Sequence, residues 1–191
     1  MQLDIKEQSL ILEGKKYSRK ELMSLSANAT GDNTSSFLLD LYRFLADWFS
    51  DSPFMTVHTS GSTGTPKVLT VRKEQMMQSA RMTCEFLNLH TGDTALLCMP
   101  LQYIAGKMMV VRALVAGLNL ILRTPSGHPL ADVTVPLRFV AMVPLQVFNT
   151  LQVLREKERL CHTDILIILG GAIALQMLLE IPIAWGSVLT T

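Results

Sequence analysis

Apolar and polar positions along the chain follow two periods. Short apolar runs bounded by turn residues, such as Thr94–Met99 and Phe139–Val143, predict buried strands. Apolar residues that recur every three or four positions predict helices, such as Phe37–Phe49, with Ser35 or Ser36 as its cap. Further strands are predicted at Leu10–Leu12, Phe54–Val57, Val68–Val71, Leu118–Leu122, Ile165–Leu169 and Ile183–Trp185. Further helices are predicted from Ser18, with Glu21 completing a capping box, at Lys73–Asn88, at Ile104–Ala116, from Pro144 onwards and at Ala174–Glu180.

Strands that alternate with helices of this length predict an α/β fold, with a mostly parallel sheet and helices on both faces. Ligands of open α/β sheets bind beyond the carboxyl ends of the strands. That rim is expected to gather Met99–Tyr103, Met142–Pro144 and Gly170–Ala172. Residues 123–137, with three prolines, predict a loop that includes at most a short helix. The charged run Arg155–Arg159 predicts a solvated helix end.

One loop stands out by its chemistry, because hydroxyls, glycines and a lysine follow one another without an acidic residue. It reads Thr59-Ser60-Gly61-Ser62-Thr63-Gly64-Thr65-Pro66-Lys67 and lies between two predicted strands. The glycines allow positive φ, so consecutive N–H groups can face one side and form an anion-binding nest. The hydroxyls add donors, and Lys67 adds a point charge suited to a phosphate. These groups suit a polyphosphate better than a sugar or a base.

Two known phosphate motifs do not fit this loop. The Walker pattern ends in Gly-Lys-Ser/Thr, whereas Pro66 precedes the lysine here and Val68 follows it. The dinucleotide fingerprint needs a third glycine and a following helix. A generic nucleotide-hydrolysing P-loop protein is therefore disfavoured. By composition alone, a flexible Ser/Gly/Thr linker is as good an interpretation as a binding loop.

The nine-residue loop resembles the phosphate loop of the adenylate-forming superfamily, which includes acyl- and aryl-CoA synthetases, peptide synthetase adenylation domains and luciferases. It matches the family's characteristic positions, although the family usually has a glycine where Val68 stands. The resemblance implies that the loop binds the β- and γ-phosphates of ATP. It assigns nucleotide binding to Thr59, Ser60, Gly61, Ser62, Thr63, Gly64, Thr65 and Lys67, and a catalytic role to Lys67.

Two further segments resemble the same family. Gly170-Gly171-Ala172 is similar to its Gly-Gly-Ala segment, whose backbone lies beside adenine and the acyl pocket; by itself it is an ordinary strand-to-helix turn. Cys98–Gly106 is similar to the Leu-Pro-Leu-Phe-His-x-x-Gly stretch, but Tyr103 replaces the histidine, so that residue's role does not carry over. Lys107 and Arg112 follow on the same predicted helix. They are candidates to meet a substrate carboxylate, together with Tyr103 and Gly106, or are plain surface charges.

The run Tyr103–Leu114 and the early position of the loop are similar to the compact o-succinylbenzoate–CoA ligases of menaquinone synthesis. This resemblance implies an AMP-forming acid–CoA ligase that uses ATP, Mg²⁺ and CoA. It implies a short strand and helix region over residues 1–52 and a nucleotide-binding α/β core over residues 53–191. The family's later segments, which supply a Mg²⁺ glutamate, a ribose aspartate and a small C-terminal domain with a lysine, have no counterpart among the 191 residues. We therefore expect an incomplete N-terminal domain without full turnover, and no metal ligand can be named.

Composition narrows the class without identifying it. The net charge of +1 indicates neither a nucleic-acid partner nor an anionic membrane surface. Cys84, Cys98 and Cys161 lie far apart, so neither a zinc site nor a disulfide framework is predicted, and a cytoplasmic location is expected. Hydrophobic residues make up 49% of the chain, but the apolar run from Ile165 to Trp185 is interrupted by Gln176, Glu180 and Pro182. Buried core explains this run better than a membrane span does.

Two expectations concern the chain as a unit. Its partner is expected to be a small aryl or acyl carboxylate. A sheet that stops at Thr191 would leave an edge and apolar surface uncovered, so we expect self-association through that sheet. The alternative to a ligase is a non-catalytic protein that binds nucleotide weakly or serves in assembly.

Overall fold

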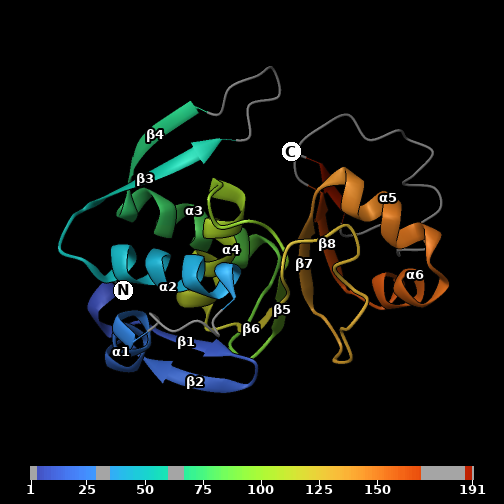
Figure 1. The fold of residues 1–191 in the computed structure, drawn as a ribbon, viewed down its shortest axis with the longest axis horizontal. Helices are drawn as coiled ribbons and strands as arrows, with labels where there is room; N and C mark the ends of the chain where they lie inside the picture. Colours follow the sequence, from blue (N-terminus) through green and yellow to red (C-terminus); the bar gives the residue numbers. More distant parts are fainter. Residues whose placement is uncertain (1–3, 29–34, 60–66, 169–187, 191) are drawn as a thin grey trace.

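The computed structural model describes residues 4–28, 35–59, 67–168 and 188–190. They form a seven-stranded sheet in the order β2-β1-β6-β5-β7-β8-β9 and a separate two-stranded sheet, β3-β4 (Figure 1). The strands are β1 (Ser9–Leu12), β2 (Lys15–Ser18), β3 (Phe54–Thr59), β4 (Lys67–Arg72), β5 (Thr94–Leu97), β6 (Asn119–Leu122), β7 (Phe139–Met142), β8 (Ile165–Ile168) and β9 (Val188–Thr190). The helices are η1 (Ile5–Glu7), α1 (Arg19–Asn28), α2 (Ser36–Phe49), α3 (Lys73–Phe86), α4 (Ile104–Ala116), α5 (Pro144–Gln152) and α6 (Leu154–Cys161).

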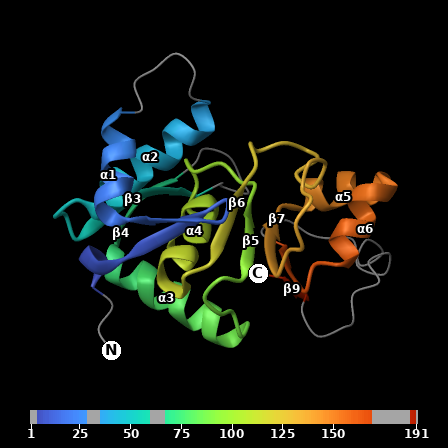
Figure 2. The same ribbon diagram turned by 90° about the horizontal axis from the view of Figure 1, so that it is seen from below.

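The large sheet is parallel except at one edge, where β1 pairs with β2 in an antiparallel ladder. Helices cover both faces: α3 and α4 lie on one side, and α5 and α6 lie on the other (Figure 2). The α/β fold with a mostly parallel, two-sided sheet is therefore confirmed.

Alternate residues of the central strands separate two hydrophobic cores, as strand geometry requires. Ala95 and Leu97 of β5 belong to the core formed with α2, α3 and α4. Leu96, which lies between them, belongs to the core formed with α5, α6 and the β6–β7 connection. Burial on both faces explains why these strands appear in the sequence as continuous apolar runs.

Local signals in the sequence set several element ends. Ser18 and Glu21 form the expected capping box, because Glu21 Oε2 accepts from the Ser18 N–H at 2.8 Å and Ser18 Oγ accepts from the Glu21 N–H at 3.4 Å. Ser35 Oγ accepts from the Leu38 N–H at 3.3 Å and caps α2. Gly117 ends α4 in the left-handed conformation, with φ of 71°.

The stretch after Pro144 differs from the prediction. One continuing helix was expected, but α5 ends at Gln152 and α6 starts at Leu154, with Val153 extended between them. The prediction that Arg155–Arg159 is solvated is wrong for Glu156, which is buried. Its Oε1 lies 2.9 Å from Nδ1 of His128, so the β6–β7 connection covers this side of α6.

Other differences are smaller. Helix α3 ends at Phe86, and Asn88, placed by prediction inside the helix, has φ of 51°. The connection over residues 123–137 holds no helix. Strand β9 was not predicted. The predicted helix Ala174–Glu180 and strand Ile183–Trp185 lie outside the described residues.

Candidate functional site

The candidate phosphate loop closes an antiparallel hairpin. Strands β3 and β4 pair from Phe54 opposite Arg72 to Thr59 opposite Lys67. The expectation that the loop joins two strands, and does not open a helix, is confirmed. The pairing brings the first and last residues of the motif directly opposite each other. Residues 60–66, which hold the other predicted phosphate-binding positions, lie outside the described part of the chain.

The base of the hairpin is fixed to the start of α3. The N–H of Lys73 donates to the carbonyl of Pro53 at 2.9 Å, and its Nζ donates to the carbonyl of Ser50 at 2.9 Å and to Ser50 Oγ at 3.2 Å. Lys73 is 2% exposed, and this burial lowers the pKa of its ammonium group, an effect that Asp47 and Asp51 oppose. The burial of Lys73 was not predicted, because a lysine at the start of a helix is usually a solvent-exposed charge.

The outer edge of β3 meets the start of α4. His58 forms a parallel β-bridge with Tyr103, the residue that precedes α4. Lys107, on the first turns of the helix, donates from Nζ to the carbonyl of Thr56 at 2.6 Å. Partial burial lowers the pKa of the Lys107 ammonium group, and Asp47 opposes the shift. The hairpin thus stands over α3 and α4 (Figure 1).

Gly106 is required where α4 follows β5. A Cβ atom on this residue would lie 2.4 Å from the carbonyl oxygen of Pro100 and 3.0 Å from that of Met99. Any larger side chain would push the helix away from the segment that leaves β5. The glycine at the end of the Cys98–Gly106 stretch therefore has a structural reason in this chain.

Arg112 does not lie with Lys107. The two residues are five positions apart on α4, which places them about 140° apart around the helix axis. The backbone carbonyl of Arg112 is 4.0 Å from Sγ of Cys84 on α3, and its Nη1 is 3.8 Å from Sδ of Met109. Burial lowers the pKa of the guanidinium, and its Nε has no hydrogen-bond partner. Of the predicted substrate group, Tyr103, Gly106 and Lys107 come together beside the hairpin, and Arg112 faces elsewhere.

The carboxyl ends of β5 and β7 form a topological switch point. These strands are neighbours in the sheet, yet β5 leads to α4 and β7 leads to α5 on the opposite face (Figure 2). Ligands of open α/β sheets bind at such points. Of the three rim segments predicted from the sequence, Met99–Tyr103 and Met142–Pro144 lie here, whereas Gly170–Ala172 lies outside the described residues.

Gln146 ties the connections at this rim together. Its Nε2 donates to the carbonyls of Cys98 and Ser126, both at 3.0 Å, while its Oε1 accepts from the N–H of Val143 at 3.1 Å. Gln146 is 5% exposed, so these bonds are shielded from water. The neighbouring Cys98 is fully buried, and burial raises the pKa of its thiol to about 12. A thiol held in its neutral form is a packing residue, not a nucleophile.

No group of three or more His, Cys, Asp or Glu side chains gathers at one point in residues 4–28, 35–59, 67–168 and 188–190. Among the same residues, no helix has the length and apolar character needed to cross a membrane.

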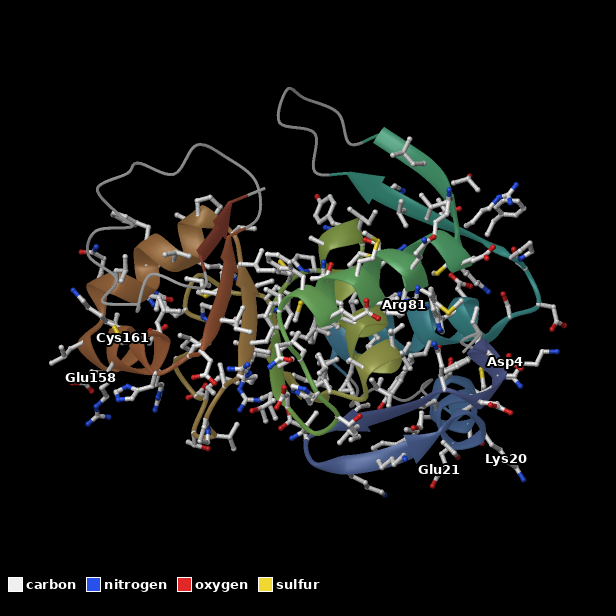
Figure 3. All side chains as sticks on the ribbon, turned by 180° about the vertical axis from the view of Figure 1, so that it is seen from behind. Asp4, Lys20, Glu21, Arg81, Glu158 and Cys161 are labelled. Carbon is white, nitrogen blue, oxygen red and sulfur yellow. The ribbon has the colours of Figure 1, made fainter. Side chains whose placement is uncertain are left out.

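A hollow of about 970 Å³ lies at the base of the hairpin, beside Pro53 and Lys73. It is bounded by η1, by the segment after α2 and by α3, and Asp4 and Arg81 are among its lining residues (Figure 3). Its lining carries both signs of charge, including Asp51 and Glu74, so it does not favour a polyphosphate.

Comparisons with known proteins agree on the fold and on the family. The family described as AMP-binding enzyme matches residues 3–177. A curated relative, the 2-succinylbenzoate–CoA ligase of Haemophilus influenzae, is 29% identical over 134 residues, which are 70% of this chain and 28% of that protein. The chain therefore spans less than a third of that relative's length.

The fold is also similar to that of solved structures. An acyl-CoA synthetase (AMP-forming)/AMP-acid ligase II-like protein from Dyadobacter fermentans matches with a TM-score of 0.75 and 30% identity, over 88% of this chain and 48% of that one. MenE of E. coli, bound to an analogue of OSB-AMS, matches with a TM-score of 0.51 and 21% identity, over 65% of this chain and 26% of that one. The second match supports the fold alone.

Proposed function

Because the chain belongs to the family of AMP-binding enzymes, we propose that its hairpin loop binds the β- and γ-phosphates of ATP during activation of a carboxylic acid. In this reaction a carboxylate oxygen attacks the α-phosphorus, the bond to the bridging oxygen breaks, and pyrophosphate leaves. The resulting acyl-adenylate passes its acyl group to the thiolate of CoA, and AMP is released. Catalysis of this kind depends on positioning and charge stabilisation.

The observation that carries the proposal is the register of the hairpin. Thr59 and Lys67 pair across β3 and β4, so the two ends of a seven-residue sequence rich in hydroxyls and glycines lie opposite each other. The same hairpin contacts Tyr103 at the start of α4, beside the carboxyl end of β5. A polyphosphate held by the loop would thus lie close to the switch point where α/β folds bind ligands.

In this proposal Thr59, Ser60, Ser62, Thr63, Thr65 and Lys67 donate to the phosphates, and Gly61 and Gly64 allow the turn. Lys67 also offsets the charge that develops on pyrophosphate as it leaves. Gly170, Gly171 and Ala172 shape the nucleotide and acyl pocket. Bound Mg²⁺ would neutralise part of the charge on the phosphates.

We further propose an aryl carboxylate of the o-succinylbenzoate type as the acid. The 2-succinylbenzoate–CoA ligase relative supports this assignment. Residues 1–52 would then form a short strand and helix region and residues 53–191 the nucleotide-binding core. For the 191 residues alone we propose phosphate binding without complete turnover, because they span 48% of the Dyadobacter protein and 28% of the Haemophilus protein.

Calorimetric titration with ATP and with pyrophosphate tests the phosphate role. Lys67→Ala should weaken binding of both by roughly ten- to hundredfold, as expected for loss of a charged hydrogen bond. Lys67→Arg should retain most of the affinity. Lys20→Ala, which removes an exposed charge on α1 far from the hairpin (Figure 3), should leave binding unchanged. Equal affinities for wild type and Lys67→Ala would refute the assignment.

Two assays test the remaining proposals. CoA-ester formation with a panel of aryl and aliphatic acids should favour the aryl succinyl acid in a protein that includes these residues and the rest of the family's length. Detection of the ester with the 191 residues alone would contradict the expected lack of turnover.

We also propose that the chain self-associates through the edge of its sheet. Light scattering should then give an apparent mass above that of a monomer.

A further inference from the structure

The β3–β4 hairpin cannot hold its position by itself. It is a two-stranded sheet outside the main sheet, and such ribbons are marginally stable in water. Its base is fixed by the bond between the Lys73 N–H and the Pro53 carbonyl. The buried side chains of Met55 and Val57 pack one face of β3 onto the core with α3 and α4. A second polar anchor would fix the strand's backbone in the half nearer the loop.

That anchor lies along the outer edge of β3. In a strand, the backbone groups of residues two apart point to the same edge. Thr56 and His58 are two apart, and both contact the start of α4: the Thr56 carbonyl accepts from Lys107 Nζ at 2.6 Å, and His58 bridges to Tyr103. The two contacts therefore extend β3 onto α4 on the side that β4 leaves open.

The start of α4 is itself a fixed point. Gly106 lies so close to Pro100 that a Cβ atom would be 2.4 Å from its carbonyl oxygen. Pro100 belongs to the segment that follows β5, and the N–H of Tyr103 donates to its carbonyl at 3.3 Å. Lys107, next to Gly106, is thus placed by the carboxyl end of the central strand.

We propose that Lys107 is a positioning residue that holds β3, and with it the Thr59–Lys67 loop, beside the carboxyl end of β5. This inference rests on the proposed function of the loop and assigns Lys107 a different role from contact with the substrate carboxylate. The lysine acts through the Thr56 carbonyl. Lys107 is half-buried and Thr56 is exposed, and the charged donor makes this bond stronger than one from a neutral group.

The test combines hydrogen exchange without ligand and titration with pyrophosphate. Lys107→Met removes the donor but keeps the length of the side chain. We expect amides of residues 54–59 to exchange about tenfold faster, and pyrophosphate to bind about tenfold more weakly, for loss of one charged hydrogen bond. Lys107→Arg, which keeps a charged donor, should leave amide exchange and pyrophosphate binding close to those of the wild type. Lys20→Met, the matched control on α1, should change neither.

The outcomes separate the anchor from the proposed function. Unchanged exchange of residues 54–59 in Lys107→Met would overturn the anchor. Weaker pyrophosphate binding with unchanged exchange would also overturn it, because Lys107 would then act on the ligand directly. Faster exchange in a protein whose wild type does not bind pyrophosphate would support the anchor and refute the function of the loop. If Lys107→Met does not fold, Lys107→Leu also removes the donor, and unchanged exchange of residues 54–59 in that variant would overturn the anchor.

Discussion

The parallel sheet and the β3–β4 hairpin bury their residues very differently. Leu96, Leu97 and Val140 of the sheet are fully buried, whereas Phe54, Val68 and Leu69 of the hairpin are 46%, 63% and 45% exposed. The sheet is packed on both faces. The hairpin contributes Met55 and Val57 of β3 to the core with α3 and α4, and is otherwise held by its ladder and a few bonds to these helices. The buried scaffold and the strands that flank the candidate phosphate loop thus belong to two different sheets.

The largest difference between the two regions should appear in their response to truncation. Leu97→Ala leaves a cavity between β5 and the helices and should lower the free energy of unfolding by about 2–5 kcal/mol. Leu69→Ala on β4 should change it by less than about 0.5 kcal/mol. Urea denaturation of both variants measures this, and equal losses would show that the hairpin is as much a part of the core as the sheet.

A second contrast lies at the junction of sheet and hairpin. Gly106→Ala brings a Cβ against the Pro100 backbone and should cost about 1–3 kcal/mol, as overpacking does. Gly127→Ala is the matched control, since its Cβ would meet only the Nδ2 end of Asn149, which can move. Thermal unfolding should separate the two variants, and a Gly106→Ala protein as stable as Gly127→Ala would contradict the close approach.

The sequence predicts local features of the fold better than contacts between residues far apart in the chain. The capping pair Ser18 and Glu21 and the helix stop at Gly117 are local signals, so the corresponding ends were predicted correctly. Burial of Glu156 and Lys73 depends on partners far along the chain, His128 and Ser50, which no local pattern reveals. The contact of Lys107 with Thr56 joins residues 51 positions apart and was likewise out of reach.

Within the candidate site, too, local features could be predicted from the sequence and long-range contacts could not. The loop's chemistry is written in consecutive residues, so its motif and its place between strands could be read directly. The separation of Arg112 from Lys107 could have been foreseen from helical spacing alone. Gln146, which joins three connections at the rim, has no distinguishing sequence signal because its partners are backbone N–H and carbonyl groups.

Alkaline pH should destabilise the sheet through Cys98. Burial raises the pKa of its thiol from 9.0 to about 12, so its contribution to stability is complete below pH 9 and is lost as pH rises towards 12. At pH 10 the loss is roughly 1 kcal/mol relative to neutral pH. The slope of stability between pH 8 and pH 10 should therefore be shallower in Cys98→Ala than in wild type, and identical slopes would refute the raised pKa.

The smallest effect is expected within the hairpin. The Arg72 guanidinium lies 5.9 Å from the centre of the Phe54 ring, across the first pair of the ladder. Arg72→Gln should speed exchange of hairpin amides by an amount equivalent to about 0.5–1 kcal/mol while global unfolding stays unchanged. Arg81→Gln, on the exposed side of α3, is the control. A matching fall in global stability would show that the hairpin and sheet unfold together.

The most direct test of the central claim is the footprint of pyrophosphate on the chain, measured by amide chemical shifts. We expect changes centred on residues 58–68, with smaller ones at Tyr103 and Lys107, and none around the hollow that Asp4, Lys73 and Arg81 help to line. A footprint at that hollow, or saturable binding that leaves residues 58–68 unchanged, would contradict the assignment of the hairpin loop as the phosphate site.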